Sequence, residues 1–280
     1  MSSITVVGSV NLDLVASCPR LPRPGETVTA TASARYPGGK GANQALAARR
    51  AGSAVTLIAA IGEDAEATEA TALLRSSEID LSRLVISPHP TGIAMITVDD
   101  MGENQIVVVP GANSTLTADH VDTAGADVVL CQLEIPLEAV SRAAKTASGL
   151  VCVNAAPPVP LPADILERTD VFIVNETERD EMSEELADTS ALVVVTLGAA
   201  GAKAYRSSRL VAEASPPPVT PIDTVGAGDA FCGAFVTALA TNFSIASALR
   251  WACAAGALAT TRRGAQPSLP TVDEINAAVA

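Results

Sequence analysis

The segment DTVGAGD, residues 223–229, carries the strongest chemical signal in the chain. Its glycine-rich turn runs directly into an apolar helical stretch, and the first turn of a helix has unpaired N–H groups and the positive end of the dipole. Gly226, Ala227 and Gly228 could therefore form an anion hole. Asp229 would repel a phosphate, so it is better suited to act as a general base toward a hydroxyl. The alternative is an ordinary glycine-rich loop whose Asp favours a helix N-terminus.

Two further polar clusters could hold a polyhydroxy ligand. The segment GGKGAN, residues 38–43, leads into a helical stretch and offers Lys40 and Asn43 as donors. Its alternative interpretation is a helix start with a solvated lysine. Asn11 and Asp13 are two residues apart in an apolar stretch, so on a strand they point the same way and could grip two hydroxyls. A turn role for this pair is equally compatible with the sequence.

Two clusters follow apolar strand candidates at their carboxyl ends, where open α/β sheets bind ligands. The first is NETE, residues 175–178, whose carboxylates could hold a Mg²⁺–water shell beside phosphates or could simply cap a helix. The second is TLGAAG, residues 196–201, which could pass under a nucleotide or form a plain hairpin turn.

Several familiar sites are excluded. The chain has no GxxxxGK[ST] phosphate loop, and Gly226, Gly228 and Gly233 do not fit GxGxxG. The five cysteines are scattered without a CxxC pair, which predicts buried, reduced thiols in a cytosolic protein. The two histidines form no metal-binding pair.

The composition narrows the class of protein further. The 280 residues carry 18 basic and 31 acidic side chains, a net charge of −13, which argues against non-specific nucleic-acid binding. Hydrophobic residues make up 48%, so we expect a folded chain with a large core. We expect no membrane span, because no apolar window reaches about 18 residues. The start MSSITVVGSV lacks a basic n-region, so no signal peptide is expected.

Short apolar runs alternate with helical stretches along most of the chain, which predicts a doubly wound, mainly parallel sheet flanked by helices. The strand candidates are residues 4–8, 55–60, 128–133, 150–154, 171–174, 192–197 and 202–206. The helix candidates are residues 42–51, 65–77, 136–147, 163–168, 227–240 and 245–262. Two strand pairs stand apart and predict a small extra sheet. They are residues 12–18 with 27–34, and 92–98 with 105–109.

Together these elements resemble the ribokinase (PfkB) family of sugar kinases over almost the whole chain. Both family signatures are present in order, as PGGKGANQALAARRAG and DTVGAGDAFCGA. The segments GSVNLD, PRPGETV, GENQIVVVPGAN, QLEIPLE and RRGAQPS are similar to those of family members that act on ribose. The resemblance implies a single domain over residues 1–280, with a discontinuous β lid at about 12–36 and 91–110. It also implies a homodimer formed through that lid.

The resemblance further implies ATP-dependent phosphorylation of D-ribose at O5, giving D-ribose 5-phosphate and ADP, with Asp229 as the base. The anion hole would be Gly226, Ala227 and Gly228. The sugar hydroxyls would contact Asn11, Asp13, Gly39, Lys40, Asn43 and Glu134. ATP would contact Asn175, Thr196, Leu197, Gly198, Ala199, Ala200, Gly201, Gly228 and Cys253. Glu178 would position Mg²⁺ through water, and K⁺ would be held by Asp223, Val225, Ala259, Arg262, Gly264 and Ser268.

Two rivals and two departures accompany this hypothesis. A sibling kinase could act on 2-deoxyribose or on a nucleoside such as adenosine, but Asn11 and Glu134 favour a free sugar with a 2-hydroxyl. Aromatic residues, at 2%, offer little to stack on a base. A non-catalytic sugar-binding protein would not need Asp229, the anion hole and Glu178 together. The segment 179–195 is shorter than the resemblance leads us to expect, and Cys253 stands where relatives can carry a larger polar side chain near the base.

Overall fold

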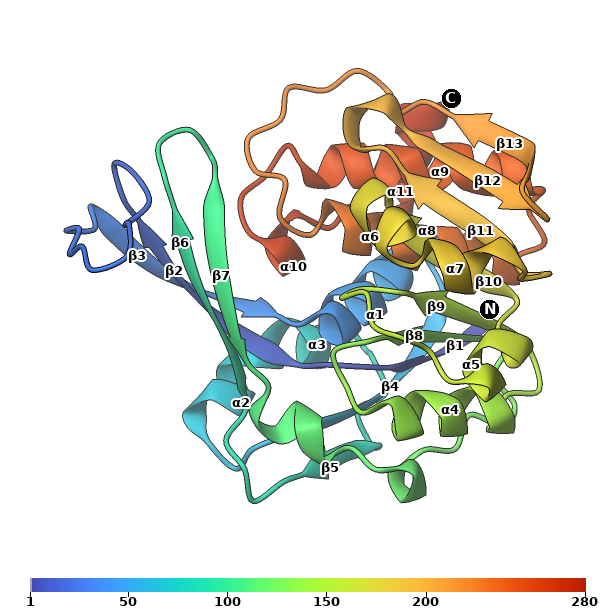
Figure 1. Ribbon diagram of the computed structural model, residues 1–280, viewed down its shortest axis with the longest axis horizontal. Helices are drawn as coiled ribbons and strands as arrows, with labels where there is room; N and C mark the ends of the chain where they lie inside the picture. Colours follow the sequence, from blue (N-terminus) through green and yellow to red (C-terminus); the bar gives the residue numbers. More distant parts are fainter. Residues whose placement is uncertain (1) are drawn as a thin grey trace.

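A nine-stranded sheet with helices on both faces forms the body of the protein (Figure 1). The computed structural model describes residues 2–280. The strand order is β13-β12-β11-β10-β9-β8-β1-β4-β5. Neighbouring strands from β11 to β5 run parallel, and β12 and β13 add an antiparallel edge. The predicted doubly wound, mainly parallel sheet is therefore confirmed.

The body and a separate small sheet contain these elements. The strands of the body are β1 (Ser3–Val7), β4 (Ala54–Ile61), β5 (Leu84–Ile86), β8 (Val128–Gln132), β9 (Leu150–Asn154), β10 (Val171–Asn175), β11 (Leu192–Thr196), β12 (Ala202–Arg206) and β13 (Arg209–Ala214). The strands of the small sheet are β2 (Asn11–Ser17), β3 (Ala32–Gly38), β6 (Gly92–Val98) and β7 (Asn104–Val109). The helices are α1 (Lys40–Arg50), α2 (Ala65–Ala70), α3 (Ala72–Ser76), α4 (Leu137–Thr146), α5 (Ala163–Arg168), α6 (Glu176–Glu181), α7 (Ser183–Ala187), α8 (Ala227–Ala240), α9 (Ile245–Ala259), α10 (Ala265–Ser268) and α11 (Val272–Val279).

The central strands are buried on both faces, which explains their nearly continuous apolar sequences. In β8, Val128 and Leu130 point into one core, while Val129 and Cys131 point into the other. The first core is closed by α1, α8 and α9, and the second by α4 and α5. The two cores lie on the faces of the sheet, so the carboxyl ends of the strands can carry polar side chains.

The glycine-rich start of α1 packs directly on the end of β1. A Cβ atom at Gly41 would lie 2.5 Å from the carbonyl carbon of Gly8, closer than any side chain allows. The Ala42 N–H also donates to the Ser9 carbonyl oxygen at 2.9 Å. Residues of the GGKGAN segment are therefore fixed against the carboxyl edge of the sheet.

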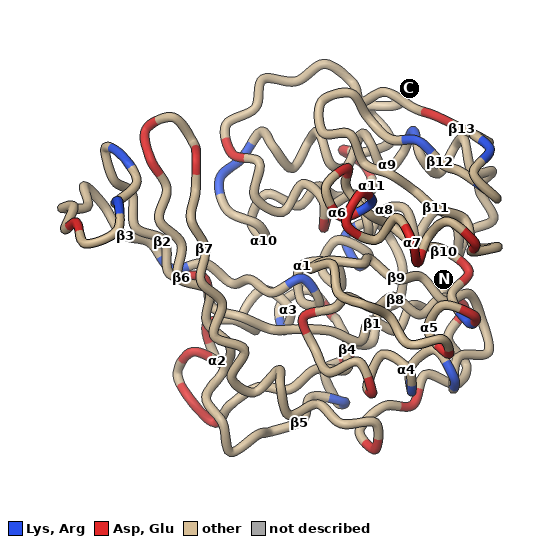
Figure 2. The backbone as a smooth tube through the Cα atoms, in the orientation of Figure 1, with Lys and Arg blue, Asp and Glu red and all other residues tan. Residues whose placement is uncertain are grey.

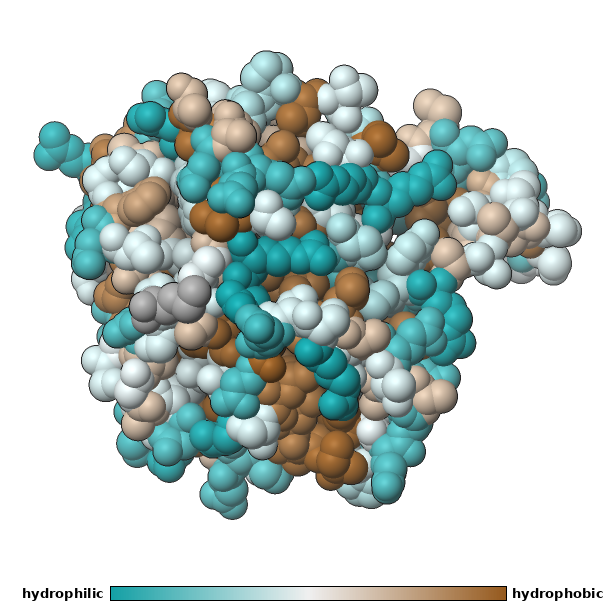
Figure 3. Space-filling view, turned by 180° about the vertical axis from the view of Figure 1, so that it is seen from behind, coloured by the Kyte–Doolittle hydropathy of each residue, from teal (hydrophilic) through white to brown (hydrophobic). Residues whose placement is uncertain are grey.

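The small sheet has the order β3-β2-β6-β7 and projects from the body as an arm (Figures 1 and 3). The predicted hairpin between β6 and β7 is present. The predicted strand at residues 27–34 is wrong, because β3 spans Ala32–Gly38. Its partner β2 ends at Ser17, which pairs with Ala32, so residues 27–31 have no strand to pair with despite their alternating Thr and Ala.

Three other boundaries differ from the sequence prediction. The helix expected at residues 65–77 breaks at Thr71, whose hydroxyl donates to the Ala67 carbonyl oxygen at 2.7 Å. The helix expected at 245–262 ends at Ala259, and the Thr260 hydroxyl donates to the Ala257 carbonyl oxygen. The edge strands β5 and β13 were not predicted, because β5 has only three residues, none of them buried, and β13 is mostly exposed.

The surface is acidic over both parts of the molecule. Acidic residues are spread over the body and the small sheet, in keeping with the net charge of −13 (Figure 2). Across residues 2–280, none of the helices has the length and apolar character that crossing a membrane requires.

Candidate active site

Asn11 and Asp13 lie on β2, where the small sheet joins the body, and both are buried. Asn113 fixes the orientation of Asn11. Its Nδ2 donates to Asn11 Oδ1 at 2.7 Å, and its Oδ1 accepts the Val10 N–H at 2.9 Å. The amide group of Asn11 is thereby left as a donor on the same side of β2 as Asp13.

Asp13 has an unusual protonation equilibrium. Burial, together with the negative charges of Glu134 and Asp229, raises the pKa of its carboxyl from 3.8 to about 7. The neighbouring charges of Glu134 and Asp229 therefore disfavour the ionised form of Asp13. Near neutral pH, the Asp13 carboxyl therefore changes between its protonated form, which has an O–H donor, and its ionised form, which only accepts hydrogen bonds.

Lys40, the first residue of α1, compensates the acidic cluster. Its backbone N–H donates to Glu134 Oε2 at 3.2 Å, and the Ser9 hydroxyl donates to the same oxygen. Burial of the ammonium group lowers the pKa of Lys40, but the carboxylates of Asp229, Glu134 and Glu178 outweigh this and raise it. The lysine therefore stays charged in the interior of the site.

Asp229 lies in the first turn of α8 and is buried. Its Oδ2 accepts a hydrogen bond from Asn43 Nδ2 and its Oδ1 accepts one from Gln44 Nε2, both at 2.9 Å. Burial raises the pKa of Asp229, while Lys40 and the two amides oppose the rise. A carboxylate with a raised pKa that is held in place suits a general base.

Gly226 caps the N-terminus of α8 in the left-handed conformation, with φ 81° and ψ −3°. A Cβ atom there would lie 2.8 Å from Ala265 Cα, so the position requires glycine. Ala227 and Gly228 follow as the first residues of the helix, at the positive end of its dipole. The predicted anion hole is thus next to Asp229, as the sequence requires.

A cavity of about 540 Å³ opens beside the start of α8, a volume typical of ligand pockets. Its walls come from the turn after β11, the proline-rich segment 216–218 and one face of α9. From the set predicted for ATP, it is lined by Thr196, Gly198, Ala199, Gly201, Gly228 and Cys253. Leu197 and Ala200 belong to the same turn but lie outside the lining, and Asn175 pairs with Thr196 on the adjacent strand.

Cys253 lines this cavity, whereas no residue of the segment 179–195 does. Burial raises the pKa of Cys253 to about 12, so the residue contributes a neutral thiol to the cavity wall. The short segment contains the end of α6 and the helix α7.

Asn175 and Glu178 form a reciprocal cap at the start of α6. The Asn175 side chain accepts the Glu178 N–H, and the Glu178 carboxylate accepts the Asn175 N–H, both at 2.8 Å. The capping interpretation is therefore realised, and burial raises the pKa of Glu178. In residues 2–280, His, Cys, Asp and Glu side chains form no group of three able to hold a metal. A Mg²⁺ ion at Glu178 would therefore depend mainly on phosphates and water for its ligands.

The segments predicted to hold a monovalent cation adjoin the anion hole. Asp223 joins two of them, because its Oδ1 accepts the Val225 N–H at 3.0 Å and its Oδ2 accepts the Gly264 N–H at 2.8 Å. The Asp223 N–H in turn donates to the Thr260 carbonyl oxygen at 3.1 Å, next to Ala259. Arg262 precedes Gly264, and the buried Ser268 closes α10. Carboxylate and carbonyl oxygens are the donors that a hard cation requires, so this set fits K⁺.

Sequence reasoning missed several residues that shape the site. Five of them are polar and buried: Ser9, Gln44, Asn113, Gln132 and Asn154. Gln132 and Asn154 each end a buried apolar strand, and this signal was available in the sequence. The proline-rich segment 216–218, interpreted only as a stiff connector, lines the nucleotide-sized cavity.

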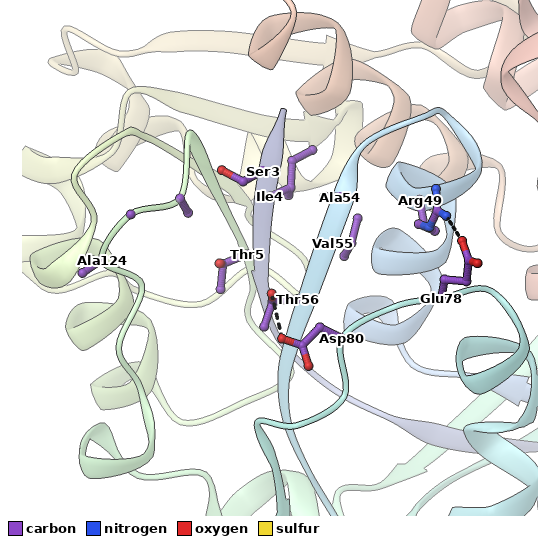
Figure 4. Close-up of a pocket in the computed structure, with 12 residues that line it drawn as sticks. Ser3, Ile4, Thr5, Arg49, Ala54, Val55, Thr56, Glu78, Asp80 and Ala124 are labelled. Carbon is purple, nitrogen blue, oxygen red and sulfur yellow. Dashed lines mark hydrogen bonds and ion pairs between the residues drawn. The ribbon is translucent and has the colours of Figure 1, made fainter. Parts of the chain in front are cut away.

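A second cavity, of about 380 Å³, lies at the opposite edge of the sheet, beside the amino ends of β1 and β4 (Figure 4). Its polar groups pair with one another, as Arg49 with Glu78 and Thr56 with Asp80. It shares no lining residue with the cavity beside α8, and open α/β sheets bind ligands at the carboxyl ends of their strands.

Comparison with known proteins identifies the family. Residues 1–272 match the pfkB family of carbohydrate kinases. The chain belongs to this family.

Three similar proteins show how this chain compares with individual members of the family. The ribokinase of Haemophilus influenzae is 38% identical over 298 aligned residues, covering 97% of this chain and 96% of the relative. The crystal structure of Thermotoga maritima ribokinase superposes with a TM-score of 0.90 at 31% identity, covering 99% of both chains. The ribokinase of Arabidopsis thaliana complexed with ribose and ATP gives a TM-score of 0.88 at 29% identity, covering 100% of this chain and 99% of that one.

Proposed function

We propose that the protein transfers the γ-phosphoryl group of ATP to O5 of D-ribose, giving D-ribose 5-phosphate and ADP. The observation that carries this conclusion is the position of Asp229. Its carboxylate accepts hydrogen bonds from Asn43 and Gln44 and directly follows the segment Gly226–Gly228. Gly228 lines the nucleotide-sized cavity. The ribokinase relatives, among them one complexed with ribose and ATP, support the same substrates.

Each part of the site has a role in this reaction. Asn11, Asp13, Gly39, Lys40, Asn43 and Glu134 bind the sugar hydroxyls. Asp229 accepts the proton of the 5-hydroxyl while the oxygen of that hydroxyl forms a bond to the γ-phosphorus of ATP. The bond between the γ-phosphorus and the oxygen that bridges it to the β-phosphate breaks, which releases ADP. The N–H groups at Gly226–Gly228 and the charge of Lys40 stabilise the transferring group, where positioning and charge dominate.

Two cations complete the proposal. Glu178 would hold Mg²⁺ through water, and the ion would neutralise charge on the ATP phosphates. The oxygen donors of Asp223, Val225, Ala259, Arg262, Gly264 and Ser268 would hold K⁺ beside the anion hole. The fit of both donor sets to hard cations supports this assignment.

The substrate is tested by measuring ADP release with ATP and Mg²⁺ on D-ribose, 2-deoxy-D-ribose and adenosine, each in K⁺ and in Na⁺. We expect the fastest turnover on D-ribose, and a higher rate in K⁺ than in Na⁺. Turnover on another substrate alone would retain the fold and Asp229 but overturn the roles of Asn11 and Glu134. Absence of turnover on all three would favour a non-catalytic sugar-binding protein.

We propose that the small sheet, residues 12–36 and 91–110, is a lid over the sugar within a single domain, and that it also forms a homodimer. Strand β7 supports the dimer, because Ile106, Val107, Val108 and Val109 are all exposed at the free edge of this sheet, Val107 by 63%. An exposed apolar edge strand is a surface that a second copy can cover. Light scattering is expected to give twice the chain mass of 28.3 kDa, and Val107→Asp to give the monomer mass. A monomeric wild-type protein would contradict the dimer.

The free cysteines fit the cytoplasmic location that we also propose.

Asp13→Asn is expected to raise stability and weaken ribose binding. Above pH 3.8 the unfolded chain releases the Asp13 proton, whereas the folded protein keeps it until about pH 7. Stability therefore falls as pH rises through this window, and the substitution removes the loss. We expect a higher Tm for Asp13→Asn, with a larger gain near pH 8 than near pH 5. Loss of a charged acceptor for hydroxyls should weaken ribose binding about 10- to 100-fold.

Calorimetric unfolding at the two pH values and ribose titration check this prediction. The measurement near pH 5 is the internal control, because Asp13 is then mostly neutral in the folded protein. Unchanged ribose affinity, or an equal fall in Tm at both pH values, would contradict the position assigned to Asp13.

A further inference from the structure

Three buried amide side chains form a continuous hydrogen-bonded chain behind Asp229. Gln44 Nε2 donates both to Asp229 Oδ1 and to Asn154 Oδ1, each at 2.9 Å. Gln132 Nε2 donates to Gln44 Oε1 at 2.7 Å. Gln44 and Gln132 are 0% exposed. Of the three amides, only Gln44 contacts Asp229 directly.

This hydrogen-bonded chain of amides connects Asp229 to the central sheet. Gln132 and Asn154 are the last residues of β8 and β9 and are register partners across these two strands. Asn154 Nδ2 donates to the Ile173 carbonyl oxygen of β10 at 3.0 Å. The three neighbouring strands β8, β9 and β10 therefore fix the amides of Gln132 and Asn154. Gln44 on α1 links these two amides to Asp229 on α8.

Only one orientation of the Gln44 amide satisfies its neighbours. Its two N–H groups face two acceptors, Asp229 Oδ1 and Asn154 Oδ1, and its oxygen faces the Gln132 donor. A flipped amide would oppose three pairs of like groups in a buried place, which costs the hydrogen bonds without compensation from water. A donor is therefore always directed at Asp229 Oδ1.

We propose that Gln44 is a positioning residue for the base, held in turn by Gln132 and Asn154. By fixing Oδ1 while Asn43 fixes Oδ2, it keeps the carboxylate in one rotamer, aimed at the reacting hydroxyl. The inference rests on the proposed function, in which Asp229 is that base.

The electrostatic surroundings give Gln44 a second effect. Burial raises the pKa of Asp229, and the carboxylates of Glu134, Glu178 and Asp13 act in the same direction. Lys40 and the amides of Asn43 and Gln44 lower the pKa, because they favour the ionised form. Cys232, on the same helix as Asp229, is a neutral thiol, since burial raises its pKa well above 9.0. Removal of the Gln44 donor should therefore move the protonation of the base to higher pH.

Gln44→Met tests the inference, because methionine keeps the length of the side chain and removes its hydrogen bonds. We expect kcat to fall about 10- to 100-fold, since small misplacements of a reacting group carry costs of this order. Ribose affinity should stay within about threefold, which separates kcat from binding. The acid limb of the kcat–pH profile should move to higher pH. Gln132→Met, which keeps both hydrogen bonds to Asp229, should change kcat in the same direction by less, and it carries the test if Gln44→Met does not fold.

Thr237→Val is the matched control. Thr237 is buried on α8, the helix that carries Asp229, and its hydroxyl bonds to the Ala48 carbonyl oxygen and to Ser53. We expect this variant to lose thermal stability with kcat and the acid limb unchanged. A folded Gln44→Met that behaves like Thr237→Val would overturn the inference.

A titration of the aspartate carboxyl carbons by ¹³C NMR separates this inference from the proposed function. The Asp229 resonance, identified by its absence in Asp229→Asn, should titrate at higher pH in Gln44→Met than in the wild-type protein. A midpoint that does not move overturns the inference even if no sugar is phosphorylated. An inactive wild-type protein in which the midpoint does move overturns only the proposed function.

Discussion

Asp229→Asn is expected to lower kcat by about 10²- to 10⁴-fold, the range for loss of a general base. The asparagine amide cannot accept the proton of the 5-hydroxyl. The asparagine also places its N–H₂ group against Asn43 Nδ2 or Gln44 Nε2, which both donate to the Asp229 carboxylate in the wild-type protein. Ribose binding should persist within a few-fold, because the other sugar contacts come from different residues. Initial rates of ADP release and calorimetric titration with ribose measure the two effects.

The fold of this variant is checked by its thermal unfolding near pH 8. Burial raises the pKa of Asp229, so its ionised carboxylate destabilises the folded protein there. The substitution removes this destabilisation but loses one of the two amide hydrogen bonds, so we expect the Tm to change little. A variant that unfolds normally and keeps more than about a tenth of the wild-type kcat, against the expected loss, shows that Asp229 is not the base.

Gly226→Ala is expected to have the second largest effect, a loss of about 10²- to 10³-fold in kcat, as for removal of an oxyanion-hole donor. Alanine at φ 81° is strained, and its Cβ would lie 2.8 Å from Ala265 Cα, which belongs to the backbone. The loop must move away from α10, and this displaces the N–H groups that would hold the phosphoryl group. Affinity for ribose should change little, so the loss appears in kcat.

Gly125→Ala is the matched control for this prediction. Gly125 also has a positive φ, of 86°, but a Cβ there meets no atom within 4 Å, and it lies at the opposite edge of the sheet. Both variants should lose about 1–2 kcal/mol of stability from the backbone conformation. If both also keep the wild-type kcat, the segment 226–228 is not the anion hole.

The parallel sheet and the glycine-rich segments could be predicted from the sequence because their signals are local. A strand buried on both faces is nearly continuously apolar, as in VVLC of β8, and a glycine-rich turn before a helix is a candidate anion site. The sequence also placed the small sheet, since the turn at residues 99–104 has hairpin composition. It misplaced β3, because the pairing of that strand depends on where β2 ends.

The support behind the base could not be predicted in the same way. Gln44 and Asp229 are 185 residues apart, and only the packing of α1 against α8 brings them together. Gln44 follows Asn43 within a glycine-rich signature, where the glycines and the lysine attract attention first. Likewise, the prolines 216–218 gain a role only when the cavity beside α9 is formed.

The most direct test of the central claim is the structure of the product. ³¹P NMR of a reaction with ATP, Mg²⁺, K⁺ and D-ribose should show one new phosphate monoester, coupled to the two protons on C5 and formed in equal amount with ADP. The same signal should be absent with Asp229→Asn over the same interval. Inorganic phosphate alone, or a monoester coupled to the proton on C1, would contradict phosphoryl transfer to O5.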